Sequence, residues 1–329
     1  MNTLYRWCRA VPAAAVTGVL CLFAATALSQ PYPSKPVTII VPFAPGGIAD
    51  VTARPLAVTL GRLLGQTFIV ENSAGAGGAL GAAIAAKARP DGYSLMMALS
   101  SLSVIPEVEK INGRVPSYLV DQFSPVALVS LNPAILVARS EAPWKTLADL
   151  IVDAKARPER INYSSSGLYG TSHVATEMLA QAAGIRMTHV PFSGGGPSMV
   201  ALLGGQVDLV VQTVGVANQH MKAGKVRVLG VFAPQRVAEM PGVPTMREQG
   251  HDVEFYVWTG LFAPTGLPTE IMARLRSAMR EAMKDPAFVQ SMTGLNTPID
   301  YLDTPEFQAF FERDGKRLAE VVRRMGKLE

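Results

Sequence analysis

The chain has 329 residues, 49% of them hydrophobic, with a formal net charge of +4, so it is long enough to bury a core in each of two domains. So small a charge argues against an extended basic surface of the kind that binds nucleic acid. Both cysteines, Cys8 and Cys21, precede residue 30, so the rest of the chain has no disulfide and no thiolate chemistry.

Residues 1–29 have the pattern of a secretory signal peptide. Arg6 and Arg9 form a basic start, an apolar stretch follows, and small residues end at Ser29. Proline, threonine and glycine interrupt the apolar stretch, which favours a processed segment over a membrane anchor. Cleavage near Ser29 removes two arginines and no acid, so we expect an exported, periplasmic protein with a formal charge of +2.

Short apolar runs then alternate with helical periodicity along the chain, which indicates an α/β fold with parallel strands covered on both faces. The predicted strands are Val37–Pro42, Thr67–Val70, Ser94–Leu99, Val126–Val129, Ala134–Arg139, Ile161–Ser164, Thr188–Pro191, Leu209–Gln212, Val226–Phe232 and a strand-rich stretch over Val253–Phe262. The predicted helices are Ala49–Leu64, Gly78–Ala88, Ser172–Ala183, Pro197–Leu203, Thr269–Lys284 and Pro305–Arg324. Between these elements, Ser100–Asp121 is less regular, and no helix or strand is assigned there.

No long linker divides the two halves of this pattern, so we expect strands to cross between two lobes near Val129 and near Trp258. The predicted lobes are residues 30–130 with 258–329, and residues 131–257. This is the geometry of a hinged, two-lobed binding protein that closes on a ligand.

Five strand-to-helix junctions are rich in small residues: "PFAPGGIAD" (42–50), "ENSAGAGGALG" (71–81), "LSSLS" (99–103), "SSSGLYGTSH" (164–173) and "PFSGGGPSM" (191–199). Glycine lets a backbone approach a ligand, and the free N–H groups at a helix start favour an anion. None of the five loops contains Lys or Arg. Each loop alone fits an ordinary tight turn, but five of them in both halves of the chain indicate a binding cleft.

Other kinds of site are poorly supported. Gly75, Gly77 and Gly81 resemble a dinucleotide fingerprint, but the third glycine comes one position late. No glycine precedes Lys-Ser or Lys-Thr, no GxSxG occurs, and the four histidines are scattered without metal-ligand spacing. We therefore expect no cofactor and no metal. Asp50 fits a helix cap, and Asp208 fits either a strand edge or a ligand contact.

Three segments resemble the Bug family of extracytoplasmic solute receptors, the substrate-binding proteins of tripartite tricarboxylate transporters. They are "YPSKPVTIIVPFAPGGIADVTAR", "ENSAGAGGALGAAIAAKARPDGYSL" and "VPFSGGGPSMVALLGGQVD". The later segments "KAGKVRVLGVFAPQRVAEMPGVPTMREQG" and "GLFAPTGLP" are similar as well. The resemblance covers the whole mature chain in order.

This resemblance implies a Venus-flytrap periplasmic-binding-protein fold without enzymatic activity or cofactor. It implies a carboxylate ligand, held by first-lobe loops and bridging waters, and membrane transporter subunits as partners of a monomeric receptor. The implied first-lobe contacts are Phe43, Ala44, Pro45, Gly46, Gly47, Asp50, Ser73, Gly75, Ala76, Gly77, Gly78, Ser100 and Ser101. The implied second-lobe contacts are Ser165, Ser166, Thr171, His173, Phe192 and Asp208.

Three departures from the family pattern bear on the ligand. Tyr169 and Gly170 stand where relatives have a small residue and a hydroxyl, Ser193 stands where they are often basic, and the segment 101–117 lacks an Asn-Pro-Ala-Leu pattern. Tyr169 joins Phe43 and Phe192 on loops expected to converge, and a ring can cover an aromatic ligand. We therefore add Tyr169 to the contacts and place aromatic carboxylates slightly ahead of aliphatic di- or tricarboxylates.

Two other functions use the same loops. A secreted hydrolase or lyase would need Asp50 or Asp208 as a base within hydrogen-bond reach of His173. A sensor subunit would bind a ligand in the same cleft and signal to a membrane partner.

Overall fold

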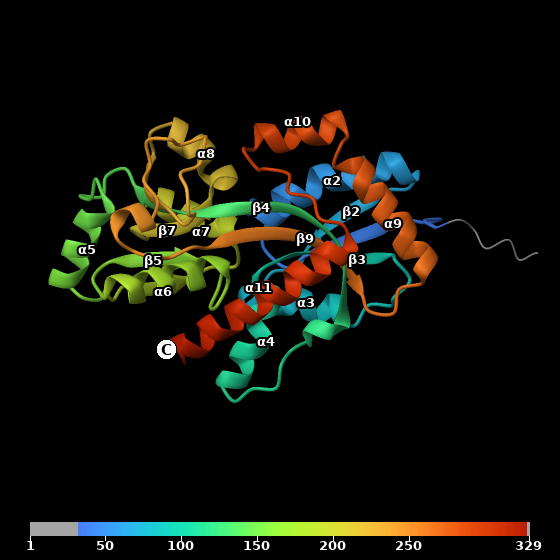
Figure 1. The fold of residues 1–329 in the computed structure, drawn as a ribbon, viewed down its shortest axis with the longest axis horizontal. Helices are drawn as coiled ribbons and strands as arrows, with labels where there is room; N and C mark the ends of the chain where they lie inside the picture. Colours follow the sequence, from blue (N-terminus) through green and yellow to red (C-terminus); the bar gives the residue numbers. More distant parts are fainter. Residues whose placement is uncertain (1–31, 328–329) are drawn as a thin grey trace, which may run out of the picture.

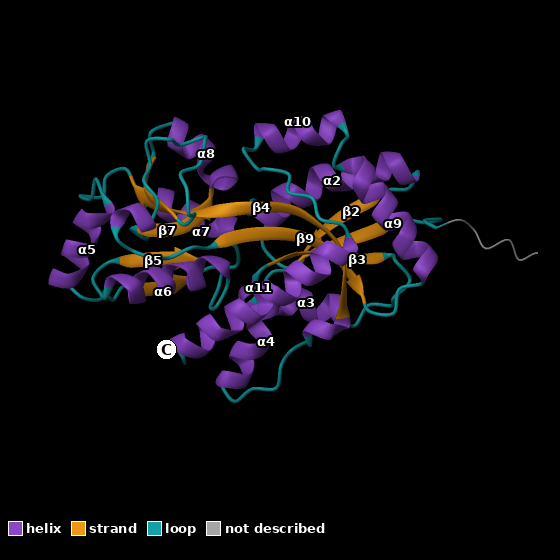
Figure 2. Cartoon of the chain, in the orientation of Figure 1, coloured by secondary structure: helices purple, strands orange, loops and turns teal. Residues whose placement is uncertain are grey.

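The structure, a computed structural model, describes residues 32–327, so the predicted signal peptide and its cleavage near Ser29 lie outside the described residues. Two α/β lobes lie along the long axis of the molecule, and helices cover both sides of the strands (Figures 1 and 2). The two-lobed periplasmic-binding-protein fold expected from the sequence is confirmed. Within residues 32–327 no helix is long and apolar enough to cross a membrane.

Lobe 1 is built on parallel strands from the first part of the chain. β1 (Val37–Val41) lies between β2 (Phe68–Asn72) and β3 (Ser94–Leu99) and pairs in parallel with both. The helical segments of lobe 1 are α2 (Ile48–Leu64), η1 (Ala76–Gly78), α3 (Ala79–Ala86), α4 (Ser101–Ile111), η2 (Val120–Gln122), α9 (Thr269–Ala282), α10 (Pro286–Gly294) and α11 (Thr304–Met325). Because α9 and α10 pack on α2, the end of the chain completes the lobe that its beginning starts.

Lobe 2 repeats this plan. β5 (Asn162–Ser165) lies between β6 (Thr188–Pro191) and β7 (Leu209–Thr213) and pairs in parallel with both. The other elements of lobe 2 are α5 (Leu147–Ala156), α6 (Thr171–Ala183), α7 (Gly195–Leu203), α8 (Val214–Lys222), β8 (Val226–Val231) and η3 (Arg247–Gln249).

Two long antiparallel strands, β4 (Phe123–Arg139) and β9 (Tyr256–Pro264), run through both lobes. They join the lobes into one sheet of order β2-β1-β3-β9-β4-β7-β5-β6, with β8 on β4. Leu131 pairs with Trp258 where the strands cross between the lobes, next to a register shift between Leu128 and Ser130. The crossing thus lies near the predicted positions, whereas the lobe boundaries at 130/131 and 257/258 stay a prediction.

A cluster of aromatic side chains fastens α11 to the crossing strands. Trp258 is fully buried, and its Nε1 donates a hydrogen bond to Asp314 on α11 at 2.8 Å. Phe307 and Phe311 of α11 contact the same indole edge-on, with ring centroids 6.0 and 5.8 Å from it. Edge-on aromatic pairs of this kind add to the free energy of simple burial, so α11 is firmly attached to the hinge strands.

Three sequence predictions of local structure were wrong. Ser100–Asp121 contains the regular helix α4, whose periodicity is obscured by Pro106 inside it. The two strands predicted at Val126–Val129 and Ala134–Arg139 are parts of the single strand β4, because polar residues and a proline interrupt its apolar run where it crosses between lobes. The short helices α5, α8 and α10 were not predicted.

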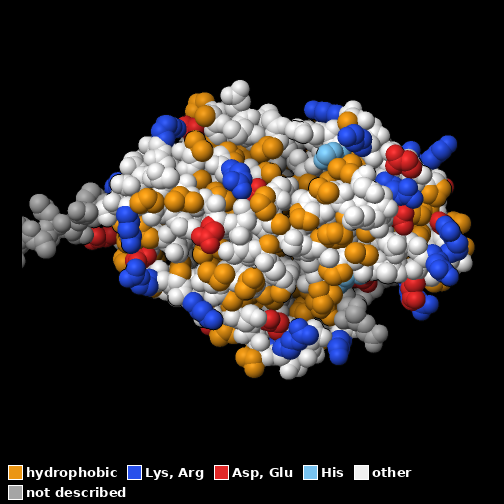
Figure 3. Space-filling view, turned by 180° about the vertical axis from the view of Figure 1, so that it is seen from behind, with side chains coloured by type: hydrophobic (Ala, Val, Ile, Leu, Met, Phe, Trp, Pro, Cys, Tyr) orange, Lys and Arg blue, Asp and Glu red, His pale blue; other side chains and the backbone are white. Residues whose placement is uncertain are grey.

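The surface shown in Figure 3 carries no concentrated basic patch. Lys and Arg side chains are scattered there among acidic and apolar ones. On this face, the distribution agrees with the small net charge of the chain and gives no support to a nucleic-acid partner.

Candidate functional site

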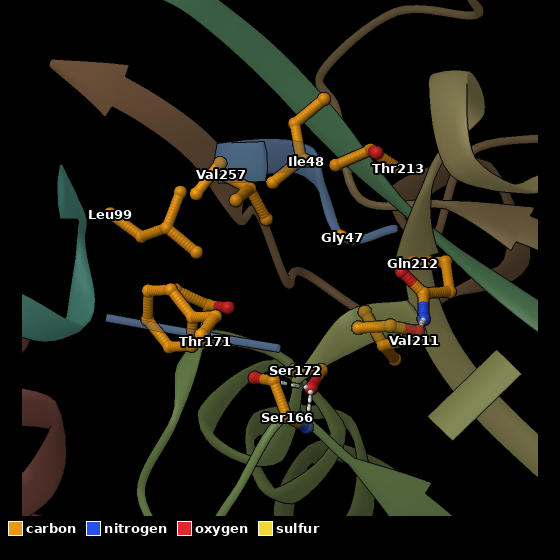
Figure 4. A pocket seen from close by; sticks show the side chains of 13 residues that line it. Gly47, Ile48, Leu99, Ser166, Thr171, Ser172, Val211, Gln212, Thr213 and Val257 are labelled. Carbon is orange, nitrogen blue, oxygen red and sulfur yellow. Dashed lines mark hydrogen bonds between the residues drawn. The ribbon is translucent and has the colours of Figure 1, made fainter. Parts of the chain in front are cut away.

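A small cavity lies between the lobes, at the carboxyl ends of strands from both (Figure 4). Its lining is Phe43, Gly47, Ile48, Ala49 and Leu99 from lobe 1, Ser166, Thr171, Ser172, Gly195, Val211, Gln212 and Thr213 from lobe 2, and Val257 from β9. Open α/β sheets bind ligands at these strand ends. The cavity offers about 30 Å³ of space to water-sized molecules, which is room for about two waters.

The lobes touch around this cavity through their backbones. The N–H of Ala44 donates a hydrogen bond to the carbonyl of Ser193 across the cleft at 3.0 Å. A Cβ on Gly196 would lie 2.2 Å from the carbonyl oxygen of Pro45, and one on Gly77 would lie 2.7 Å from that of Leu168. Because only glycine permits such approaches, the glycine loops serve as contact surfaces between closed lobes.

Four helices begin at the cavity wall: α2, α6, α7 and α8. Their N-cap residues are Gly47, Gly170, Gly194 and Thr213, and none of them makes a side-chain capping hydrogen bond. The first N–H groups of a helix have no partner within it, and the helix dipole adds a partial positive charge. Since no Lys or Arg among residues 32–327 lines the cavity, backbone N–H groups and hydroxyls are the anion-binding groups that the described lining offers.

On the lobe 1 side, a buried carboxylate holds the loop between β1 and α2. Asp50, 3% exposed, accepts hydrogen bonds from the Gly46 N–H at 3.0 Å, from Arg54 Nη2 at 2.7 Å and from Asn72 Nδ2 at 3.0 Å. Burial acts to raise the pKa of Asp50, but the hydrogen bonds from Arg54, Gly46 and Asn72 outweigh it, so this pKa lies below its usual value. Asp50 therefore positions the loop, and its charge is already paired.

On the lobe 2 side, hydroxyls and imidazoles hold the loop between β5 and α6. Ser172 Oγ accepts from the Ser166 N–H at 2.7 Å, and His173 Nδ1 accepts from the Tyr169 N–H at 2.8 Å. The His173 ring stacks on His189 with centroids 3.9 Å apart. Burial, followed by the neighbouring His189, lowers the pKa of His173 to about 3, and burial lowers that of His189 to about 4.

The cavity brings together only part of the predicted set of contacts. Phe43, Gly47, Ser166 and Thr171 line it. Ala44, Pro45, Gly46 and Gly77 lie instead where the lobes touch. The remaining predicted residues that do not line the cavity are Asp50, Ser73, Gly75, Ala76, Gly78, Ser100, Ser101, Ser165, Tyr169, His173, Phe192 and Asp208.

Tyr169 and Asp208 lie farthest from the predicted role. The Tyr169 side chain is 3% exposed and lines a separate pocket with Ala76 and Ile105, where its hydroxyl reaches the Gly326 carbonyl at 3.5 Å. Asp208 precedes β7, whereas the cavity lies at the other end of that strand, and its carboxylate binds Arg139 and the backbone of Asn162. Position along the chain could not reveal which way the Tyr169 ring turns.

The hydrolase or lyase alternative required a carboxylate beside His173. The hydrogen bonds of Asp50 and Asp208 go to other groups, and the Nδ1 of His173 accepts from a backbone N–H. His173 lies in a groove with His189 and Glu177 rather than in the cavity. Neither Asp50 nor Asp208 therefore forms with His173 the carboxylate–imidazole pair that this chemistry needs.

Sequence reasoning missed several lining residues: Ile48, Ala49, Leu99, Ser172, Gly195, Val211, Gln212, Thr213 and Val257. Ile48, Ala49, Leu99, Ser172 and Gly195 lie within the loops that the sequence singled out, although they were not chosen as contacts. Outside those loops, Gln212 and Thr213 carried a signal as two polar residues that end the apolar run of β7. Gln212 Nε2 donates to the Gly195 carbonyl at 2.7 Å, which ties the end of β7 to the start of α7.

Comparisons with known proteins agree with this architecture. The family model for the tripartite tricarboxylate transporter family receptor matches residues 52–327. The protein BugT of Bordetella pertussis is 34% identical over 313 residues, 92% of this chain and 93% of BugT. The solved periplasmic binding protein BugD is 33% identical with a TM-score of 0.84, over 90% of this chain and 99% of its own.

Two further solved structures hold organic acids. MatC from Rhodopseudomonas palustris with bound malate is 32% identical with a TM-score of 0.81, over 88% of this chain and 99% of MatC. The R. palustris protein Rpa4515 with adipate is 28% identical with a TM-score of 0.81, over 89% of this chain and 97% of its own.

Proposed function

Because this chain belongs to the tripartite tricarboxylate transporter receptor family, we propose that it is a periplasmic receptor that binds a small aliphatic dicarboxylic acid between its lobes. The observation that carries the proposal is the cavity where four helices begin, with hydroxyls and without a cationic side chain. Such a site suits a desolvated carboxylate held by N–H and O–H donors. Malate and adipate in two relatives support the aliphatic class.

The preference for aromatic acids drew on rings at Phe43, Tyr169 and Phe192. Of these three, Phe43 lines the cavity, whereas Tyr169 lines the pocket beside Ala76 and Ile105, so the main support for placing aromatic acids first is lost. With room for about two waters, the closed cavity also implies that the lobes move apart for an acid to enter.

Calorimetric titration of the mature protein with succinate, malate, adipate, benzoate and phthalate tests this proposal. We expect the aliphatic dicarboxylates to bind more tightly and to be recovered unchanged. A ligand at about 100 times its dissociation constant adds about 2.7 kcal/mol to the free energy of unfolding, so thermal denaturation provides a second readout. Tighter binding of benzoate or phthalate contradicts the ligand class, and conversion of an acid to a product contradicts the receptor function.

We further propose that the receptor is exported, cleaved near Ser29 and monomeric, and that it delivers its ligand to the membrane subunits of a transporter. Lobe 1 would comprise residues 30–130 with 258–329, and lobe 2 residues 131–257. N-terminal sequencing of protein released from the periplasm tests the cleavage site. Transport of the bound acid that stops when the receptor gene is deleted would distinguish uptake from sensing.

A further inference from the structure

One buried hydroxyl in the cavity wall has no partner. Thr213 is 2% exposed, and its Oγ1 forms no hydrogen bond with any described residue. A buried polar atom left unpaired costs free energy, so native structures rarely keep one without a ligand or a water for it. Several buried side-chain oxygens within residues 32–327 have no hydrogen-bond partner. Of the residues that carry them, only Thr213 lines the cavity.

The position of Thr213 in the backbone makes its unpaired hydroxyl unusual. Thr213 ends β7 and is also the N-cap of α8, a position where threonine ordinarily accepts a hydrogen bond from the helix's own first turn. Here no such capping bond forms. The Thr213 hydroxyl therefore does not accept from the first N–H groups of α8, and those N–H groups lack the acceptor that an N-cap side chain usually provides.

Lobe 1 faces this helix start at close range. A Cβ on Gly215, two residues after Thr213, would lie 2.4 Å from Thr297 Oγ1 and 3.8 Å from Ile48 Cδ1, both in lobe 1. Figure 4 shows Thr213 beside Ile48, the first residue of α2. The positive ends of α2 and α8 thus lie near one another across the cavity, an arrangement that an acid with a negative charge at each end would stabilise.

We propose that Thr213 is a specificity-determining residue, whose hydroxyl donates to the second carboxylate of a dicarboxylic ligand. The start of α2, at Gly47, Ile48 and Ala49, holds the first carboxylate, and Thr213 with the first turn of α8 holds the other. This inference rests on the proposed function. It adds that the receptor distinguishes dicarboxylates from monocarboxylates through lobe 2.

Calorimetric titration with succinate, malate, adipate and butyrate tests the role of Thr213 in four proteins: the wild type, Thr213→Val, Thr213→Ser and Thr52→Val. Thr52 is the matched control, since its Oγ1 is also buried and unpaired but does not line the cavity. We expect Thr213→Val to weaken dicarboxylate binding about 10- to 100-fold, the usual range for a hydrogen bond to a charged group. Thr213→Ser and Thr52→Val should stay near the wild-type affinity, and butyrate binding should not change in any variant.

The ligand-free melting temperature separates binding from structure. A hydroxyl without a protein partner loses nothing when valine replaces it, so Thr213→Val should melt at or above the wild-type temperature. Unchanged dicarboxylate affinity in Thr213→Val, or an equal loss for butyrate, overturns the role of Thr213 while the proposed function stands. A wild-type protein that binds none of the acids overturns the proposed function and this inference with it. If Thr213→Val melts below the wild type, Thr213→Ala replaces it in the titration and Thr213→Ser stays the conservative control. Weaker dicarboxylate binding in Thr213→Ala alone then supports the role of Thr213, and unchanged binding overturns it.

Discussion

The two loops that face each other across the cavity are held by different chemistry. In lobe 1 a charged network fixes the loop, with Asp50 bound to Arg54, Asn72 and the Gly46 N–H. In lobe 2 neutral groups do the same work, with Tyr169 N–H on His173 and Ser166 N–H on Ser172. The charge in the first loop is paired by Arg54 and does not line the cavity, whereas hydroxyl side chains of the second loop, at Ser166, Thr171 and Ser172, do line it.

This difference makes the two lobes lose stability in different ranges of acidic pH. Asp50 has a pKa below its usual value, so the stability it contributes is present above about pH 4 and is lost only as the pH falls further. His173 is neutral in the folded protein, with a pKa of about 3 against about 6.5 in an unfolded chain. Its contribution is present above about pH 6.5 and declines as the pH falls toward 3, so mild acid weakens lobe 2 first.

A side chain that prevents the two loops from touching should have the largest effect on ligand affinity. Gly196→Ala places a methyl group 2.2 Å from the Pro45 carbonyl of the other lobe, but Gly196 has no positive φ that would strain alanine within lobe 2. We expect a folded protein that cannot close and that binds dicarboxylates about 100-fold more weakly, a difference of about 2.7 kcal/mol. Titration measures the affinity, and small-angle scattering with saturating ligand measures closure.

Gly294→Ala is the control for that variant, because a Cβ there meets nothing within 4 Å. It should bind like the wild type and show the same decrease in radius of gyration on adding ligand. Native affinity in Gly196→Ala would mean that ligand binding does not require the contact between Pro45 and Gly196.

Removing the charge from the lobe 1 network should have the next largest effect. Asp50→Asn leaves Arg54 without its anion and sets the new amide hydrogens against either the Gly46 donor or the Asn72 donor, because these two bind different carboxylate oxygens. Since Arg54 is half exposed, we expect the free energy of unfolding in urea at pH 7 to fall by about 2–3 kcal/mol. Asp252→Asn removes an exposed partner of Arg247 and should cost less than about 1 kcal/mol. Equal losses in the two variants would argue against a structural role for the Asp50 network.

Mild acid should affect the two loops least, and lobe 2 more than lobe 1. Between pH 6.5 and 5 the neutral His173 should cost the folded state about 1.6 kcal/mol, since the unfolded imidazole is half protonated at pH 6.5 and a full proton is worth about 1.4 kcal/mol per pH unit. His189, whose pKa burial also lowers, adds a loss of the same sign. Glu177, whose pKa burial raises, offsets part of that loss. Hydrogen exchange corrected for intrinsic rates should show lobe 2 amides around His173 losing protection before those around Asp50. His173→Gln should reduce the pH dependence of urea unfolding, and an unchanged dependence would contradict the assignment.

Local patterns in the sequence predicted much of the fold. The apolar run Val37–Val41, ended by Pro42 and followed by Gly46 and Gly47, predicts a strand, a turn and a helix start because each feature depends on neighbours along the chain. The same reasoning fails for β4, whose polar middle crosses from one lobe to the other. There the strand is stabilised by its pairing with β9, more than one hundred residues away, and not by its own composition.

The sequence alone was enough to predict α/β lobes with glycine loops at strand ends, since strand periodicity, helix starts and the conformational freedom of glycine are local properties. Only the tertiary structure decided which loop side chains face the cavity. It turned Tyr169 and His173 away, paired the charge of Asp50 with Arg54, and left Thr213 Oγ1 buried and unpaired at the wall. The reason is physical: the direction of a side chain, and the partner that satisfies it, depend on the packing of elements that are distant in the sequence.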